Sequence, residues 1–154
     1  MTEPAPLLLY DGTCGFCAAS VAFMLRHERQ HTLRFATIEG PVGSDIRRRH
    51  PHLESIDSMV WVDPPAEGRP EVVLVRSAAA LRAARYLGGP WRILVLGTLL
   101  PTGVRDRMYG WIARHRHSLT RGEPACFVPS PDQARRFVDR GPASVPLTGS
   151  SPHP

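Results

Sequence analysis

The chain has 154 residues, 42% of them hydrophobic and 21% charged, which suits one globular domain with a buried core. The net charge is +5, and all 19 basic residues are arginines, which is typical of the codon usage of a GC-rich genome. No aromatic residues interleave with the densest arginine cluster, 47–49, so nucleic acid is not a favoured partner. The longest apolar run, 93–100, is shorter than the roughly 20 residues of a membrane span. Residues 1–6 carry no basic residue, so we expect no secretory signal there. We therefore expect a cytoplasmic, bacterial protein without a membrane span.

Apolar runs and turn residues predict an alternation of strands and helices. Thr13 and Ser77 are the expected N-caps of the first and third helices, and Gly88-Gly89 is expected to end the third. The turn at 64–68 joins two strands into a hairpin. Strands are expected at 7–10, 33–38, 58–63 and 71–75, and helices at 14–27, 40–49, 78–87, 91–99 and 103–116.

The resulting order, β-α-β-α-β-β-α with further helices, predicts the fold class. It is the order of an α/β protein with a thioredoxin-like fold, in which helices flank a central mixed sheet. The hairpin after the second helix distinguishes this fold from a purely parallel sheet. One domain is expected over 5–138, and the tail at 141–154 has too little apolar content to fold and is expected to be disordered.

Two cysteines open the first helix directly after the first strand. In a reducing cytoplasm a Cys-x-x-Cys pair is more often catalytic or metal-binding than a structural disulfide. Cys14 is expected to be exposed in the first turn, where the helix dipole stabilises a thiolate nucleophile. Cys17, one turn later on the apolar face, could resolve a mixed disulfide between Cys14 and a partner. This chemistry needs no organic cofactor, because the electrons reside on the sulfurs.

Asp11 precedes Cys14 by three residues at the end of the predicted strand. Its carboxylate could take the Cys17 proton during resolution, directly or through water. Asp-Gly is also a standard turn pair, so Asp11 could serve the turn alone. The spacing does not distinguish these two interpretations.

Other functions are consistent with the same cysteines. They could be two inert buried residues, or they could belong to a zinc site completed by Cys126 with His115 or His117, although the irregular spacing of this second group does not favour zinc. The main alternative to an enzyme is a binding or redox-sensing module whose arginine-rich surface contacts an acidic partner.

The segment Tyr10–Cys17 resembles the Asp-Gly-x-Cys-x-x-Cys signature of the DCC family of thiol-disulfide oxidoreductases. The resemblance covers about residues 5–138 and includes 57–60, 77–81, 87–89, Pro101, 105–106, Tyr109, 111–114 and Cys126.

This resemblance implies a thioredoxin-like fold and dithiol–disulfide chemistry, with Asp11, Cys14 and Cys17 as the site. It implies a protein or small-molecule thiol or disulfide as the partner. One departure concerns the place before the third strand, where thioredoxins carry a cis-proline that helps to bind the partner peptide. Asp57-Ser58 occupies that place here.

Overall fold

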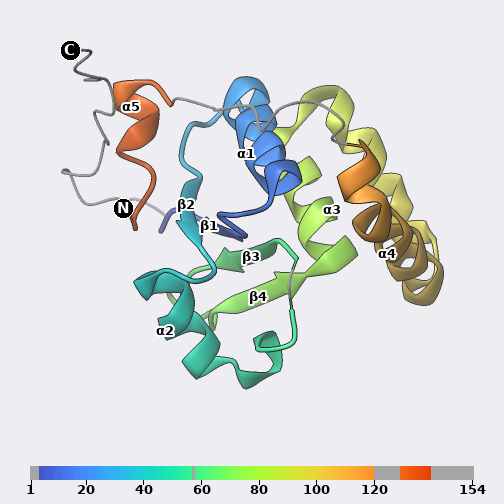
Figure 1. Ribbon diagram of the computed structural model, residues 1–154, viewed down its shortest axis with the longest axis horizontal. Helices are drawn as coiled ribbons and strands as arrows, with labels where there is room; N and C mark the ends of the chain where they lie inside the picture. The colour runs from blue at the N-terminus through green and yellow to red at the C-terminus, as the bar shows by residue number, and fades with distance from the viewer. Residues whose placement is uncertain (1–3, 57, 120–128, 140–154) are drawn as a thin grey trace, which may run out of the picture.

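The computed structural model describes residues 4–56, 58–119 and 129–139, with the backbone alone at 116–119 (Figure 1). Four strands form one mixed sheet in the order β2-β1-β3-β4. β1 is parallel to β2 and antiparallel to β3, and β3 pairs antiparallel with β4. This arrangement confirms the predicted thioredoxin-like α/β class. The strands are β1 (Leu7–Tyr10), β2 (Arg34–Thr37), β3 (Val60–Asp63) and β4 (Val72–Val75).

Helices cover both faces of this sheet (Figure 1). α1 and α3 lie on one face and α2 lies on the other, while α5 lies beside β2. Among the described residues, none of the helices combines the length and the apolar character needed to cross a membrane. The helices are α1 (Gly15–His27), α2 (Pro41–Arg49), η1 (Pro51–Leu53), α3 (Arg76–Leu87), η2 (Gly89–Leu99), α4 (Thr102–Leu119) and α5 (Pro131–Ala134).

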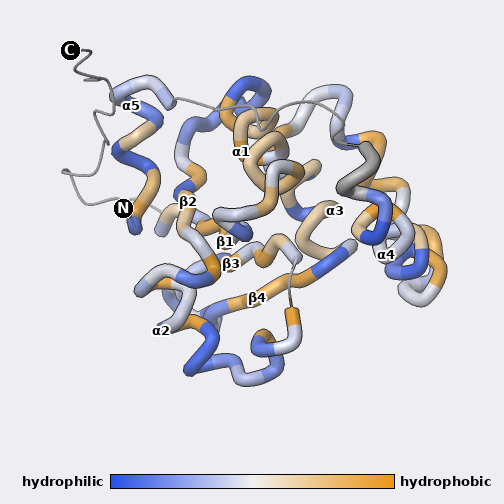
Figure 2. The backbone as a smooth tube through the Cα atoms, viewed as in Figure 1, coloured by the Kyte–Doolittle hydropathy of each residue, from blue (hydrophilic) through white to orange (hydrophobic). Residues whose placement is uncertain are grey.

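Each face of the sheet has its own apolar core, because successive strand residues point to opposite faces. Leu8 and Trp61 belong to the core that α1 and α3 cover. Leu9 and Val62, their neighbours in sequence, belong to the core that α2 covers. A strand can therefore be apolar along its whole length, as β4 is, which is orange in Figure 2.

The N-caps predicted for α1 and α3 are wrong, whereas α3 ends at Gly88 as predicted. Cys14, not Thr13, occupies the N-cap of α1. α3 starts one residue before Ser77, whose hydroxyl donates to Asp106 and accepts from Arg105 Nε at 3.0 Å. A tertiary partner on α4 thus replaces the local capping bond that the sequence predicted.

The segment predicted as a helix at 91–99 is helical, with the tighter 3-10 winding of η2. Pro90 has no amide hydrogen to donate and Gly97 is a weak helix former, so the longer-range bonds of an α-helix are disfavoured. Bonds spanning three residues are observed instead, such as that from the Leu100 amide to the Gly97 carbonyl at 3.1 Å. The tail predicted to be disordered, 141–154, lies outside the described residues.

The short helix α5 was not predicted, because four residues are too few to show a helical period. Ser130 and Gln133 close a capping box at its start. The chain then runs parallel to β2, where Phe137 forms a bridge with Phe35 and the two rings stack at 5.2 Å.

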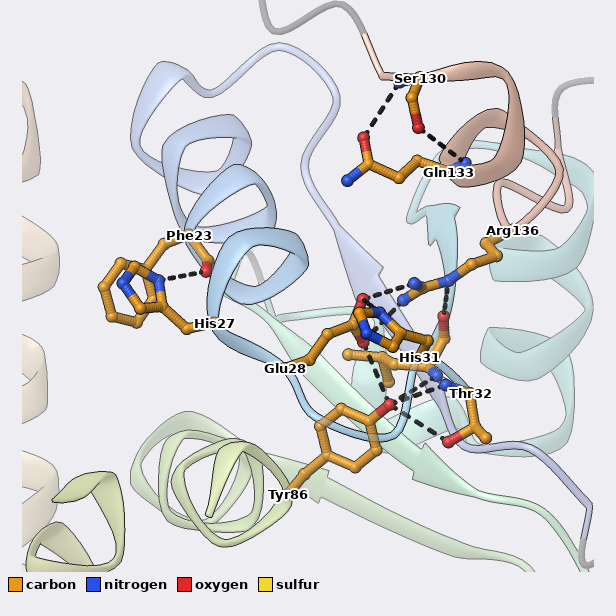
Figure 3. A network of polar contacts seen from close by, with 10 residues as sticks. Phe23, His27, Glu28, His31, Thr32, Tyr86, Ser130, Gln133 and Arg136 are labelled. Carbon is orange, nitrogen blue, oxygen red and sulfur yellow. Dashed lines mark hydrogen bonds and ion pairs between the residues drawn. The ribbon is translucent and has the colours of Figure 1, made fainter. Parts of the chain in front are cut away.

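A buried ion pair anchors this C-terminal segment to the end of α1 (Figure 3). The Glu28 side chain is fully buried, and Arg136 donates to both of its carboxylate oxygens. Arg136 Nε also donates to the Leu33 carbonyl at 2.9 Å. The Tyr86 hydroxyl donates to Glu28 at 3.1 Å and accepts from the amides of Thr32 and Leu33. α1, α3, the start of β2 and the C-terminal segment therefore meet at one carboxylate.

We predict that Arg136→Met destabilises the protein by roughly 3–5 kcal/mol, because it leaves the Glu28 charge buried without its partner. The free energy of unfolding in urea measures this effect. Arg135→Met is the matched control, since that side chain is 82% exposed and should change stability by under about 1 kcal/mol. Glu28→Gln combined with Arg136→Met should recover part of the loss. Equal stability of the Arg135 and Arg136 variants would contradict the prediction.

Candidate functional site

The predicted site lies where the central strand passes into α1. Tyr10 is buried at the end of β1, and the turn that follows is closed by a hydrogen bond from the Cys14 amide to the Asp11 carbonyl at 3.3 Å. Cys14 has extended backbone angles, and its carbonyl accepts the first helical bond, from the Ala18 amide at 3.0 Å. The pair is therefore held by the middle of the sheet at one end and by a 13-residue helix at the other.

Both cysteines are free thiols that belong to the core between the sheet and α1–α3. Cys17 is 3% exposed, as its place on the apolar face predicted. Cys14 is 7% exposed, so the prediction of an exposed sulfur is wrong. As the N-cap, Cys14 lies between the end of the strand and the first turn, where its side chain packs against apolar neighbours. The space beside Gly15 is open, since a Cβ there would meet no atom within 4 Å.

Burial is the main influence on the chemistry of the second cysteine. Because a thiolate loses its hydration there, burial is the largest of the influences that together raise the pKa of Cys17 from its ordinary value of 9.0 to about 12. The hydrogen bond with Cys14 and the Asp11 charge act on the pKa in the same direction as burial, whereas a hydrogen bond to the Asp11 backbone lowers it. Cys17 is therefore a thiol, not a thiolate, at neutral pH.

Asp11 has a clear role in the turn. Its carboxylate accepts hydrogen bonds from the Thr13 amide at 2.8 Å and the Thr13 hydroxyl at 2.7 Å. This is the turn chemistry that Asp-Gly predicted. The same carboxylate lies close enough to Cys17 for its charge to raise the pKa of that thiol. The structure thus places Asp11, Cys14 and Cys17 close enough together for Asp11 and Cys14 to influence the pKa of Cys17.

The segment before β3 contributes neighbours that the motif alone did not indicate. Met59 packs against the core cluster that contains both cysteines. Ser58 is 8% exposed, and its hydroxyl has no hydrogen-bond partner among the described residues. The sequence carries Asp57-Ser58, and no proline, at the place where thioredoxins have their cis-proline.

The zinc alternative concerns residues that the structure describes only in part. Cys126 and the side chain of His117 lie outside the described residues. His115 is described, and its ring stacks on Trp111 at 4.5 Å. Within the described ranges no three His, Cys, Asp or Glu side chains gather as a metal site would require.

The fold and the cysteine pair define a thioredoxin-like protein with a Cys-x-x-Cys motif at the start of α1. Residues 8–122 match the family model of the DCC1-like thiol-disulfide oxidoreductases, and the chain belongs to that family.

Two relatives extend this comparison. The uncharacterized protein YuxK of Bacillus subtilis is 30% identical over 136 residues, covering 88% of this chain and 95% of YuxK. A chloroplastic DCC family protein of Arabidopsis thaliana is 25% identical over 126 residues, covering 80% of this chain and 70% of the plant protein. No solved structure matches the chain significantly.

We predict that native Cys17 resists alkylation. In a Cys14→Ser, Cys126→Ser variant, iodoacetamide at pH 8.5 should modify Cys17 at least roughly tenfold more slowly in the native protein than in urea, because only the thiolate reacts. Mass spectrometry measures the rate.

Since folding raises the pKa of Cys17, the stability that the protonated thiol provides is complete below pH 9 and is lost as the pH rises toward 12.

The matched control retains Cys14 alone, through Cys17→Ser and Cys126→Ser. The alkylation rate of this variant shows how readily iodoacetamide reaches the sulfur of Cys14. Equal alkylation rates of Cys17 in the native and unfolded chains would contradict the protected thiol.

Proposed function

We propose that the protein is a thiol-disulfide oxidoreductase that exchanges electrons with a protein or small-molecule disulfide through Cys14 and Cys17. The observation that carries this proposal is the position of two free thiols, three residues apart, where the central strand meets the start of α1. Membership of the DCC1-like family supports it. We place the reaction in the cytoplasm, whose thiols would return an oxidised pair to the dithiol.

Cys14 is proposed as the nucleophile. It lies at the N-cap of a long helix whose first turn carries no acidic residue, so the positive end of the helix dipole is available to a thiolate there. Cys14 is also less buried than Cys17, and the open space beside Gly15 gives a partner chain room to approach. Cys17 then acts as the resolving thiol from within the core.

The reaction has two balanced steps. The Cys14 thiolate attacks one sulfur of the substrate disulfide, a mixed disulfide forms, and the other substrate sulfur leaves as a thiolate that takes up a proton. Cys17 then attacks the Cys14 sulfur, which releases the second substrate sulfur as a thiol and forms the Cys14–Cys17 disulfide. The substrate gains two electrons and the dithiol loses two. An external thiol reductant restores the dithiol.

The second step needs a base, because the pKa of Cys17 is about 12. We assign this role to Asp11, whose charge already acts on Cys17. The two hydrogen bonds from Thr13 hold the carboxylate at the end of the turn. Asp11 would accept the Cys17 proton as the sulfur attacks and return it to the departing substrate thiolate.

The experiment that tests the function is a redox titration of the full chain. The purified protein is equilibrated in buffers of oxidised and reduced dithiothreitol, alkylated, and its free thiols are counted by mass. We expect one reversible two-electron step confined to Cys14 and Cys17. With a disulfide substrate, Cys14→Ser should abolish turnover, whereas Cys17→Ser should accumulate a mixed disulfide on Cys14.

Two results would contradict this function. One is the absence of a reversible step, and the other is thiols that react only after a chelator is added. Either result favours the binding or metal-holding module. A mixed disulfide on Cys17 in the Cys14→Ser protein, with retained turnover, would reverse the two assigned roles.

We further predict that Asp11→Asn slows resolution of the mixed disulfide by roughly a hundredfold at pH 7, because the amide still accepts the Thr13 hydrogen bonds but cannot take a proton. Acid quenching and mass spectrometry separate the two steps, and the first step should keep its rate. Asp45→Asn, an exposed change on α2, is the control for loss of one negative charge. An unchanged resolution rate in Asp11→Asn would leave Asp11 with the turn alone.

A further inference from the structure

An apolar pocket of about 360 Å³ opens between α1, α3 and η2, and Phe16 of the Cys-x-x-Cys motif is part of its lining. Its volume falls within the range of sites that bind small groups in proteins. Its walls come from four parts of the chain: one side of α1, one side of α3, the start of η2 and the residue before β3. The lining residues are Phe16, Ala19, Ser20, Phe23, Met24, Met59, Ala80, Ala83, Ala84, Leu87, Trp91 and Leu94.

The pocket exists because small and large side chains face each other across it. The α3 wall carries three alanines, whereas the α1 wall carries Phe16 and Phe23. At the outer end, the Phe23 and Trp91 rings meet edge to face with centroids 4.8 Å apart. Protein interiors are normally close-packed, so a hollow of this size between two helices forgoes contacts that larger residues on α3 would make.

The lining favours an apolar occupant. Ser20 and the Trp91 indole carry the only side-chain oxygen and nitrogen among the lining residues. The Ser20 hydroxyl already donates to the Phe16 carbonyl at 2.9 Å. A polar group that entered would lose its hydration with little to replace it, whereas an apolar group would gain the free energy of burial.

The pocket reaches the motif through one residue, Phe16. Phe16 lies between Cys14 and Cys17 in the sequence and forms part of the lining. Met59 belongs to the lining and also packs against the core cluster that holds both sulfurs. A molecule joined to Cys14 would therefore have its neighbouring groups at the edge of the pocket.

The surface outside the pocket is also apolar. Besides Leu94 in the lining, η2 carries Ile93, Leu96 and Leu99, which are 69%, 61% and 82% exposed. A partner that extends beyond a single side chain would contact this surface, which suits a polypeptide better than a compact polar thiol.

We propose that the pocket binds a large apolar side chain of a polypeptide disulfide, close to the cysteine that Cys14 attacks. This inference rests on the proposed function and names its substrate class: disulfides of polypeptides whose cysteine is flanked by bulky apolar residues. The pocket positions the substrate sulfur, while Cys14 and Cys17 carry out the exchange described above.

The test uses two substrates that differ only in their flanking residues. Each is a short peptide whose one cysteine forms a disulfide with glutathione, with phenylalanine on both sides of the cysteine in one peptide and serine in the other. With the native chain and dithiothreitol as reductant, kcat/KM should be roughly tenfold or more higher for the phenylalanine peptide, as burial of one large apolar side chain predicts.

Variants that fill the pocket identify it as the source of this preference. Ala80→Phe on α3 and Ala19→Phe on α1 enter it from opposite walls, and Ala19 is exposed enough to accept the larger ring. Each should lower kcat/KM for the phenylalanine peptide roughly tenfold, so that its advantage over the serine peptide is lost. Ala78→Phe, on α3 but outside the lining, is the control. Thermal unfolding verifies that each variant is folded.

The outcomes separate the two proposals. If the native chain reduces both peptides with equal efficiency, or if the filled variants keep the preference, the pocket inference is wrong and the oxidoreductase function stands. Equal efficiency is also the result expected if a segment of this chain outside the described residues occupies the pocket. If the native chain reduces neither peptide and shows no reversible redox step, the proposed function fails and the inference fails with it.

Discussion

The position of β1 in the middle of the sheet is the constraint on which the rest of the structure depends. Both edges of this strand are hydrogen-bonded, one to β2 and one to β3, and both of its faces are covered by apolar cores. The end of β1 at Tyr10 therefore cannot shift without disturbing both cores. The turn from Asp11 to Thr13 leaves from this fixed point, and so the cysteines at the start of α1 have a fixed place.

The two sides and the two ends of α1 make different contacts. One side buries Cys17, Val21 and Leu25 against the sheet, and the next side forms a wall of the apolar pocket. Its last residues lead to Glu28, whose buried carboxylate is bound by Arg136. Anchoring both ends of the helix in this way orients the motif without any contact from a ligand.

The exchange proposed above would need opposite environments for its two sulfurs. An attacking sulfur requires a stabilised thiolate, which the start of a helix favours. A resolving sulfur must stay protonated until the mixed disulfide forms, which burial ensures by raising the pKa of Cys17. Asp11 lies close to both cysteines, and its carboxylate accepts two hydrogen bonds from Thr13 within the turn.

The sequence by itself determined the local elements, the fold class and the motif, because these depend on residues close together in the chain. The period of apolar residues predicted β1 to β4 and the main helices, and the spacing of Asp11, Cys14 and Cys17 predicted the site. Only the tertiary structure decided what depends on distant residues. It buries Cys14, pairs Ser77 with α4, and joins Glu28 to Arg136 across 108 positions of sequence. The apolar pocket likewise arises only where α1, α3 and η2 meet, since no single segment contains its walls.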